Sequence, residues 1–323
     1  MQSSLAQEFN KTATAAYRVF PKELERLTVL LVPSSDAPVY VSPAVAHELT
    51  KSSAAVSQSV RELAKTMHDL NAVGVASNGY TLAGTPVNLI ALQDSSEIKG
   101  LFSDRFTREM DIIFTLDHEI GHHIVKNGHP TSRFFGASPH LTESAADAFA
   151  MLRHIQRFGK NTDQAGNLAQ KVAGYAVLFA DTEHYTTNAL QRAIKVADEM
   201  GDYIFSLPLH QTAELAAKIA AESELDRKAL KRIRDAYNSC AKNCEARIGN
   251  RRDVLTKLYD GDKDACALYC RETLAVMRRH QNDPAVFKAG KEFLNYPPVK
   301  KFMMEAAAPN TNSQRSTNPR FGQ

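Results

Sequence analysis

The sequence predicts an α+β protein with a small N-terminal sheet and a mostly helical C-terminal part. Two features support this prediction. Short apolar runs bounded by proline or glycine occur before residue 94, whereas helical periodicity with much alanine dominates from about residue 104 to about residue 305. The chain has 323 residues, of which 43% are hydrophobic, so it can bury a sizeable core.

The N-terminal part mixes helical and extended patterns. Residues 1–25 predict a short amphipathic helix that ends near Pro21, and residues 44–70 carry apolar side chains near helical spacing. The segment 73–93 has glycine, asparagine and proline around apolar stretches and predicts one or two strands. Three short apolar runs are strand candidates, and they lie at 27–33, 38–43 and Val87–Gln93. Within the segment 73–93, Val87–Gln93 is the better candidate.

Three later segments are helical by period and alanine content, and they lie at 165–180, 187–205 and 212–240. The polar tail is rich in proline, asparagine and serine and is expected to be disordered. We therefore expect three parts. They are a core of strands and a central helix at 1–160, a helical subdomain at 161–305, and a disordered tail at 306–323.

Composition excludes several classes of function. The net charge is only +3 with 23% charged residues, which gives no indication of a nucleic-acid partner. No apolar run reaches the roughly 18 residues that span a membrane. Residues 1–20 lack a basic segment followed by an apolar one, so no secretory leader is expected. The protein is expected to be cytoplasmic, or exported without a conventional signal peptide as a secreted effector. Oligomeric state is left open.

The stretch TLDHEIGHHIVKNGH, residues 115–129, contains four histidines. His118, Glu119 and His122 form the pattern H-E-x-x-H. On a helix, residues i and i+4 share a face, so both imidazoles can bind one ion. Glu119 lies beside that face. Its carboxylate can therefore reach a metal-bound water molecule without being a metal ligand itself. The alternative is a solvated helix with coincidental histidines, but the flanking residues are apolar and predict a buried helix, where unpaired polar groups are costly.

A catalytic zinc needs a third protein ligand. Glu143 and Asp147 follow on the next helical segment, where their i, i+4 spacing places both on one face. Glu143 can then bind the metal while Asp147 accepts the N–H of a ligand histidine and fixes its tautomer. Taken alone, each acid has a simpler interpretation, as a helix-start acid or as a solvated polar residue.

The segments HEIGH and ESAADAFA resemble the gluzincin zinc metallopeptidases, and the resemblance covers about residues 87–155. The two segments are similar to those of membrane and periplasmic peptidases that have the same second helix. They are also similar to those of small bacterial regulatory domains. The resemblance implies a zincin-like core, one catalytic Zn²⁺ and a protein or peptide substrate. The chain departs from the membrane relatives because it has no membrane span. The implied roles are metal ligand for His118, His122 and Glu143, general base for Glu119, and support of a ligand for Asp147.

In the chemistry that the resemblance implies, the metal activates a water molecule, Glu119 takes its proton, and a peptide bond is hydrolysed, as by an endopeptidase. A further donor from the later helical part is expected to stabilise the oxyanion, and His184 and Tyr185 are the candidates. A polar cluster at a helix start is their simpler interpretation. By resemblance, Val87–Gln93 is expected to be the edge strand that pairs with the substrate.

The four cysteines form two C-x3-C pairs, each of which lies on one face of a predicted helix. An antiparallel helical hairpin would place Cys240 opposite Cys270 and Cys244 opposite Cys266. Three states are open: two disulfides, a four-thiolate structural zinc site, or reduced cysteines packed as small hydrophobic residues. Disulfides would favour an exported protein.

Two other functions compete with the peptidase. One is a non-catalytic helical regulatory or binding protein that retains a zincin-like metal site. The other is a metal-dependent hydrolase of a different bond. The presence of Glu119 favours catalysis, because a general base has no structural task and is lost first from a decayed site.

Overall fold

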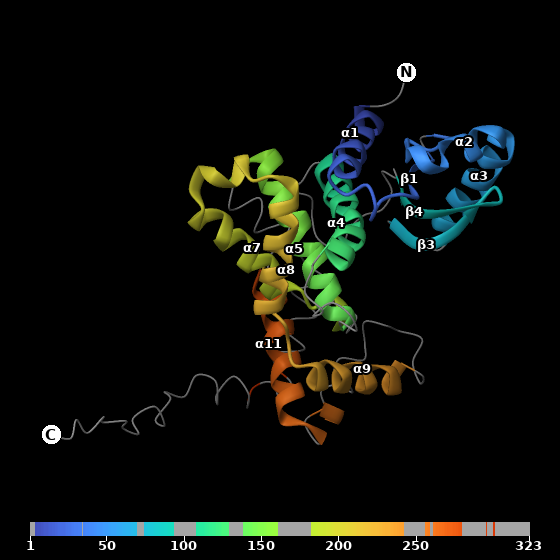
Figure 1. Ribbon diagram of the computed structural model, residues 1–323. Coiled ribbons are helices and arrows are strands. Elements are labelled where there is room, and N and C mark those ends of the chain that lie inside the picture. Colours follow the sequence, from blue (N-terminus) through green and yellow to red (C-terminus); the bar gives the residue numbers. More distant parts are fainter. Residues whose placement is uncertain are drawn as a thin grey trace. The chain divides into compact units, whose positions relative to one another are not determined.

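The computed structural model describes residues 4–33, 35–69, 74–93, 108–128, 138–160, 182–241, 256–258, 261–279, 295 and 300. The chain divides into two compact units, Met1–Arg227 and Lys228–Gln323. The predicted helix at 165–180 and the predicted disordered tail at 306–323 lie outside the described residues. The α+β class is confirmed, since the first unit combines a four-stranded sheet with packed helices (Figure 1).

The sheet has the strand order β2-β1-β4-β3 and is mixed. Strands β1 and β4 are parallel, while β2 pairs with β1 and β3 pairs with β4 in antiparallel fashion. Strands β3 and β4 form a hairpin whose turn residues, Ala83 and Gly84, both have positive φ, of 50° and 85°. Such a turn matches the twist of the strands it joins. The strands are β1 Leu27–Val32, β2 Tyr40–Val41, β3 Gly74–Leu82 and β4 Thr85–Gln93.

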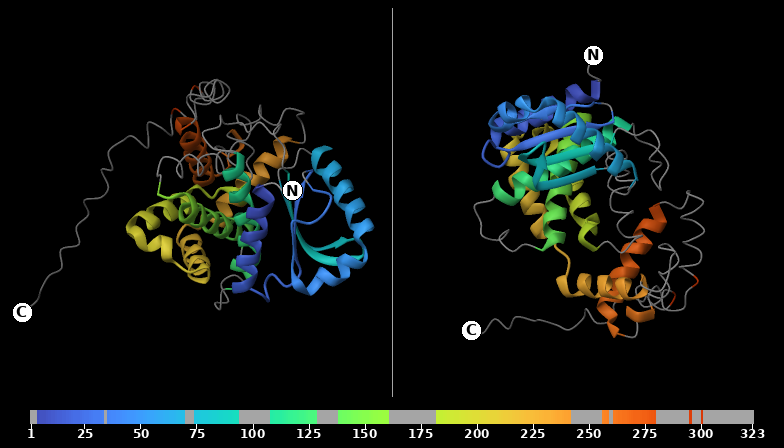
Figure 2. Two further views of the ribbon diagram at one scale, coloured as in Figure 1. Left: turned by 90° about the horizontal axis from the view of Figure 1, so that it is seen from above. Right: turned by 90° about the vertical axis from the view of Figure 1, so that its right-hand side faces the viewer.

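Helices cover both faces of the sheet (Figure 2). Alternate residues of β1 belong to two separate cores: Leu27, Val29 and Leu31 pack with the helices α1 and α4, and Leu30 and Val32 pack with α2 and α3. Burial on both faces explains why the residues of β1 are apolar with the exception of Thr28, which is also buried. These helices are α1 Ser4–Val19, α2 Pro43–Lys51, α3 Ser53–Asp69 and α4 Arg108–Gly128.

A second helical layer packs against α4. Its central helix α5 contacts α4 on one side and α7 and α8 on the other (Figure 1). Most of α5 is buried, and many of its residues are alanine, which lets three helices approach it closely. The elements of this layer are α5 Pro139–Phe158, the 3-10 turn η2 Thr182–His184, α7 Thr187–Glu199, the 3-10 helix η3 Gly201–Ser206 and α8 Leu209–Glu222.

The structure differs from three expectations. The predicted helix at 44–70 is divided at Ser52, and the one at 212–240 is divided between Glu222 and Arg227, where α9 Arg227–Ala241 begins. Both breaks contain serine, which competes for backbone hydrogen bonds and disfavours helix interiors. The predicted helix at 187–205 ends at Glu199 and is followed by the 3-10 helix η3. The two compact units divide at 227/228, and the predicted division near residue 160 stays a prediction.

The second unit contains most of α9 and the helix α11 Lys263–Arg279. Asp262 caps α11, since its carboxylate accepts hydrogen bonds from the backbone N–H groups of Asp264 and Ala265 at 2.9 Å each. Cys266 and Cys270 on α11 are buried free thiols. Their predicted pairing with Cys240 and Cys244 stays a prediction, since the latter two side chains lie outside the described part. No helix that the structure describes has the length and hydropathy to span a membrane.

Candidate metal centre

The predicted ligands lie on two helices that approach each other closely. Gly121 of α4 faces Ala146 of α5, and a Cβ atom on Gly121 would stand 3.1 Å from the Cα atom of Ala146. Glycine at this position therefore allows the backbones to approach. Helix α5 begins at Pro139, and Ser138 caps it, since its hydroxyl accepts a hydrogen bond from the N–H of Leu141.

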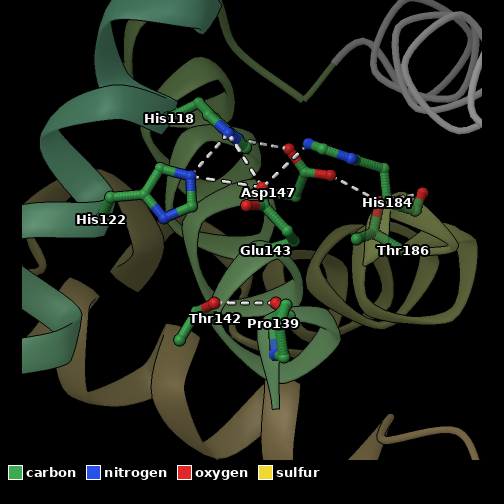
Figure 3. Close-up of polar contacts among 8 residues, drawn as sticks. All are labelled: His118, His122, Pro139, Thr142, Glu143, Asp147, His184 and Thr186. Carbon is green, nitrogen blue, oxygen red and sulfur yellow. Dashed lines mark hydrogen bonds and ion pairs between the residues drawn. The ribbon is translucent and has the colours of Figure 1, made fainter. Parts of the chain in front are cut away.

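His118, His122 and Glu143 form a group that could hold a metal ion (Figure 3). The Nε2 atoms of the two histidines are 3.0 Å apart. Oε2 of Glu143 lies 3.3 Å from Nε2 of His118 and 3.2 Å from Nε2 of His122. Tetrahedral ligands about 2.0–2.1 Å from zinc are about 3.3 Å from one another, so these separations fit one ion.

Asp147 lies behind the donor group and contacts one of its histidines. Its Oδ1 atom is 2.6 Å from Nδ1 of His118, the ring nitrogen that faces away from the other donors. The carboxylate thereby directs the free Nε2 of His118 toward Glu143. The second oxygen of Asp147, Oδ2, accepts a hydrogen bond of 2.5 Å from the hydroxyl of Thr186. Asp147 is completely buried, and both of its oxygens are paired.

The charges of the group depend on these contacts. Burial would lower the pKa of His118, but the Asp147 carboxylate, with help from Glu143 and Glu119, raises it well above the usual value for histidine. Burial would likewise raise the pKa of Glu143, yet hydrogen bonds from His118, His122 and His184 hold it well below its usual value. Glu143 is therefore an anion, and a cation in the group would replace protons as the partner of its carboxylate.

A pocket of about 380 Å³ opens beside the donor group. One wall is formed by the motif residues of α4, including Glu119, and another by Thr142 and Glu143 of α5. A third wall comes from Ala76, Ser77 and Asn78 of β3. Glu119 is partly exposed there and is not a member of the donor group, as the sequence predicted for a general base.

The structure separates the two candidates for the oxyanion donor. His184, at the end of η2, lines the pocket, and its Nε2 atom is 3.1 Å from Oε2 of Glu143 (Figure 3). Tyr185 is 1% exposed and does not line this pocket. Its carbonyl oxygen accepts a hydrogen bond of 3.3 Å from Nε2 of His140. Consecutive residues at a turn point in different directions, so only His184 reaches the site.

The strand assignment beside the pocket was wrong. Val87–Gln93 belongs to β4, which is an interior strand between β1 and β3. The edge strand is β3, whose pairing with β4 is interrupted by a register shift between Ser77 and Tyr80. Periodicity identifies a strand but not its place in the sheet.

Sequence reasoning missed three contributions to the site. His123, which is not part of the H-E-x-x-H pattern, is 5% exposed and lines the pocket. Ser77 and Asn78 come from a strand that carries no metal-binding motif, so no sequence signal marks them. Thr186 immediately follows His184 and Tyr185, but nothing in its spacing connects it with Asp147, which lies 39 positions earlier.

Comparison of the chain with family models, with curated proteins and with solved structures gave no match. We therefore infer the chemical character of the site from its residues alone. Two imidazole nitrogens and one carboxylate oxygen form a donor set that suits zinc and other borderline divalent ions. With three protein donors on one side and an open pocket on the other, such an ion would keep a coordination position accessible to solvent.

Proposed function

We propose that this chain is a zinc-dependent endopeptidase with a zincin-like core, as its resemblance to gluzincins implies. The observation that carries the proposal is the convergence of His118, His122 and Glu143 at one side of an open pocket that also contains Glu119. A structural zinc site is closed by four protein ligands, whereas a catalytic one has three and an open position. This site has three donors and a free carboxylate beside them.

The residues of the chain have distinct tasks in such a reaction. A bound zinc ion would supply Lewis acidity, which polarises the substrate carbonyl and makes water more acidic. Glu119 takes the proton of the attacking water and passes it to the leaving amine. His184 stands at the pocket wall beside Glu143, where its imidazole can donate to the negative charge that develops on the carbonyl oxygen. Asp147 keeps His118 in the tautomer that leaves Nε2 free.

The substrate of this proposed peptidase is an extended peptide. Strand β3 is at the edge of the sheet and contributes Ala76, Ser77 and Asn78 to the pocket wall. An edge strand offers unpaired backbone N–H and C=O groups, and pairing with them binds a peptide with little dependence on its side chains. The interruption of β3 after Ser77 limits the length of regular pairing next to the donor group.

The variant Glu119→Gln tests this proposal, because it removes the base and leaves the donor group intact. We expect wild-type protein and the variant to bind one zinc ion each, while cleavage of a mixture of unfolded proteins falls by at least about 100-fold in the variant. Zinc content is measured by elemental analysis and cleavage by the release of new N-termini. A conservative surface variant, Glu62→Gln on α3, is the matched control and should cleave like the wild type.

Equal cleavage by wild type and Glu119→Gln would contradict the role of Glu119. Zinc binding by both proteins without cleavage by either would contradict the peptidase and favour the second function, a non-catalytic protein that retains the metal site. Absence of zinc from both would contradict both functions.

A further inference from the structure

We propose that Thr186 is a positioning residue of the metal centre, which acts through Asp147 to hold His118 in its ligand geometry. This inference rests on the proposed metal site. It adds a third layer to that site, because Thr186 belongs to the N-terminal end of α7 and touches none of the three donors in the described contacts. The consequence is that docking of α7 on α5 and affinity for the metal depend on each other.

The contact chain runs without interruption from α7 to the donor group. The Thr186 hydroxyl donates to Oδ2 of Asp147 at 2.5 Å, and Oδ1 of Asp147 lies 2.6 Å from Nδ1 of His118. Thr186 is 1% exposed and Asp147 is 0% exposed, so water does not compete for either contact. A carboxylate held at both oxygens cannot rotate about its terminal bond, and this fixes the plane in which the His118 ring lies.

The position of Thr186 in the chain suggests a simpler role, which the geometry does not support. Thr186 is the N-cap of α7, a position where threonine commonly accepts a backbone hydrogen bond. Its side chain makes no such bond. Its Oγ1 atom lies 2.5 Å from Oδ2 of Asp147 but 3.4 Å from the carbonyl oxygen of His184, so its one proton is donated to Asp147. The hydroxyl therefore serves the buried carboxylate rather than the helix end.

The same turn also approaches the donor group from another side. His184 lies two residues before Thr186, and its Nε2 atom is 3.1 Å from Oε2 of Glu143. Figure 3 shows both side chains pointing from this turn toward the residues of α4 and α5. A shift of α7 would thus move the support of His118 and the partner of Glu143 together, which makes the fixed position of Thr186 important for both helices.

Thr186→Val tests the inference, since valine keeps the shape of threonine and removes its hydroxyl. The next residue, Thr187, provides a matched control: it is 6% exposed, and its hydroxyl has no hydrogen-bond partner among the described residues. We expect Thr186→Val to weaken zinc binding by about 10-fold or more, the usual effect of losing an outer partner of a ligand. Thr187→Val should bind zinc within about 2-fold of the wild type, and Thr186→Ser should restore most of the affinity.

The measurement is zinc affinity by competition with a chromophoric chelator, with thermal unfolding of the metal-free proteins recorded beside it. A double-mutant cycle with Asp147→Asn separates positioning from a general effect on folding. If Thr186 acts through Asp147, the valine substitution adds little loss of affinity in the Asp147→Asn background. Full additivity of the two losses would overturn the inference, as would equal affinities of the Thr186→Val and Thr187→Val variants.

Failure of this inference is distinguishable from failure of the metal site itself. Glu143→Ala removes a proposed ligand and should abolish tight zinc binding. If Glu143→Ala binds zinc as the wild type does, the metal site is wrong. If Glu143→Ala loses zinc but Thr186→Val retains full affinity, the site stands and the role of Thr186 is wrong. Should Thr186→Val not fold, Thr186→Ala, which also removes the hydroxyl, replaces it in the same cycle with Asp147→Asn.

Discussion

At the scale of single residues, the partners of a buried titratable group decide whether it serves the site or the fold. Asp147 and His154 are both on α5 and both nearly inaccessible, at 0% and 2% exposure. The buried carboxylate is paired at both oxygens and faces the donor group. His154 lies two turns further along, with its ring centroid 4.9 Å from that of Phe158, and belongs to the packed interior.

His154 makes the stability of the fold depend on pH. Burial, and then the positive charge of Arg157, lowers the pKa of His154 to about 4, whereas an unfolded histidine titrates near 6.5. Between these values the unfolded chain binds a proton that the folded chain does not. The free energy of unfolding therefore falls as pH drops from about 6.5 to about 4, by on the order of 3 kcal/mol, and this contribution is constant below pH 4.

The variant His154→Leu should lose this part of the pH dependence. Urea unfolding of both proteins at pH 7, 5.5 and 4.5 measures the effect as a difference between the two curves, which removes the contributions of the other histidines. We expect the wild type to lose more stability on acidification than the variant. Parallel curves would show that His154 takes up its proton at the same pH in the folded protein as in the unfolded chain.

The residue scale also shows the limit of sequence reasoning about the site. The i, i+4 spacing within each helix predicted which residues share a helix face. These are His118 and His122 on one helix, and Glu143 and Asp147 on the other. The sequence did not show whether His184 or Tyr185 faces the pocket, because a shift of one residue in the turn exchanges the directions of the two side chains. Contacts such as the one between Thr186 and Asp147 depend on how separate helices dock, which one sequence does not reveal.

At the scale of elements, the close packing of α4 on α5 brings the two halves of the donor group together. Gly121→Ala tests this dependence. The added Cβ would meet the Cα atom of Ala146 at 3.1 Å and a ring carbon of Phe149 at 3.3 Å, so the helices must separate. We expect a loss of about 1–3 kcal/mol in the free energy of unfolding and weaker zinc binding, although the substitution touches no ligand.

Alanine is intrinsically better than glycine in a helix by about 1 kcal/mol, so any loss at Gly121 comes from packing. Denaturant unfolding and chelator competition measure the two effects. An unchanged or more stable Gly121→Ala protein with full zinc affinity would mean that the helices tolerate separation without moving the donors.

Elements with strong periodicity were predictable, and their arrangement was not. The apolar run at 27–33 correctly predicted the buried strand β1. The breaks at Ser52 and after Glu222 were missed because the apolar period continues across them. The position of β4 inside the sheet was missed because strand order depends on contacts between distant segments, which leave no local pattern.

At the scale of the whole molecule, the candidate site belongs to one compact unit. All donors and every residue of the pocket wall lie within Met1–Arg227. We therefore predict that a fragment ending at Arg227 folds cooperatively and binds zinc with the affinity of the full chain. Thermal unfolding and chelator competition on the fragment test this. A fragment that unfolds without a transition, or that binds no zinc, would contradict the independence of the first unit.

The central claim is that one zinc ion is held by two imidazoles and one carboxylate at the meeting of α4 and α5. X-ray absorption at the zinc edge, recorded on full-length protein loaded with one equivalent of zinc, tests this claim most directly. The claim predicts that the zinc ion has a first shell of nitrogen and oxygen atoms at about 2.0–2.1 Å, with an imidazole signature. This shell is lost in the Glu143→Ala variant. A shell of sulfur at about 2.3 Å would instead place the ion at the cysteines and contradict the account.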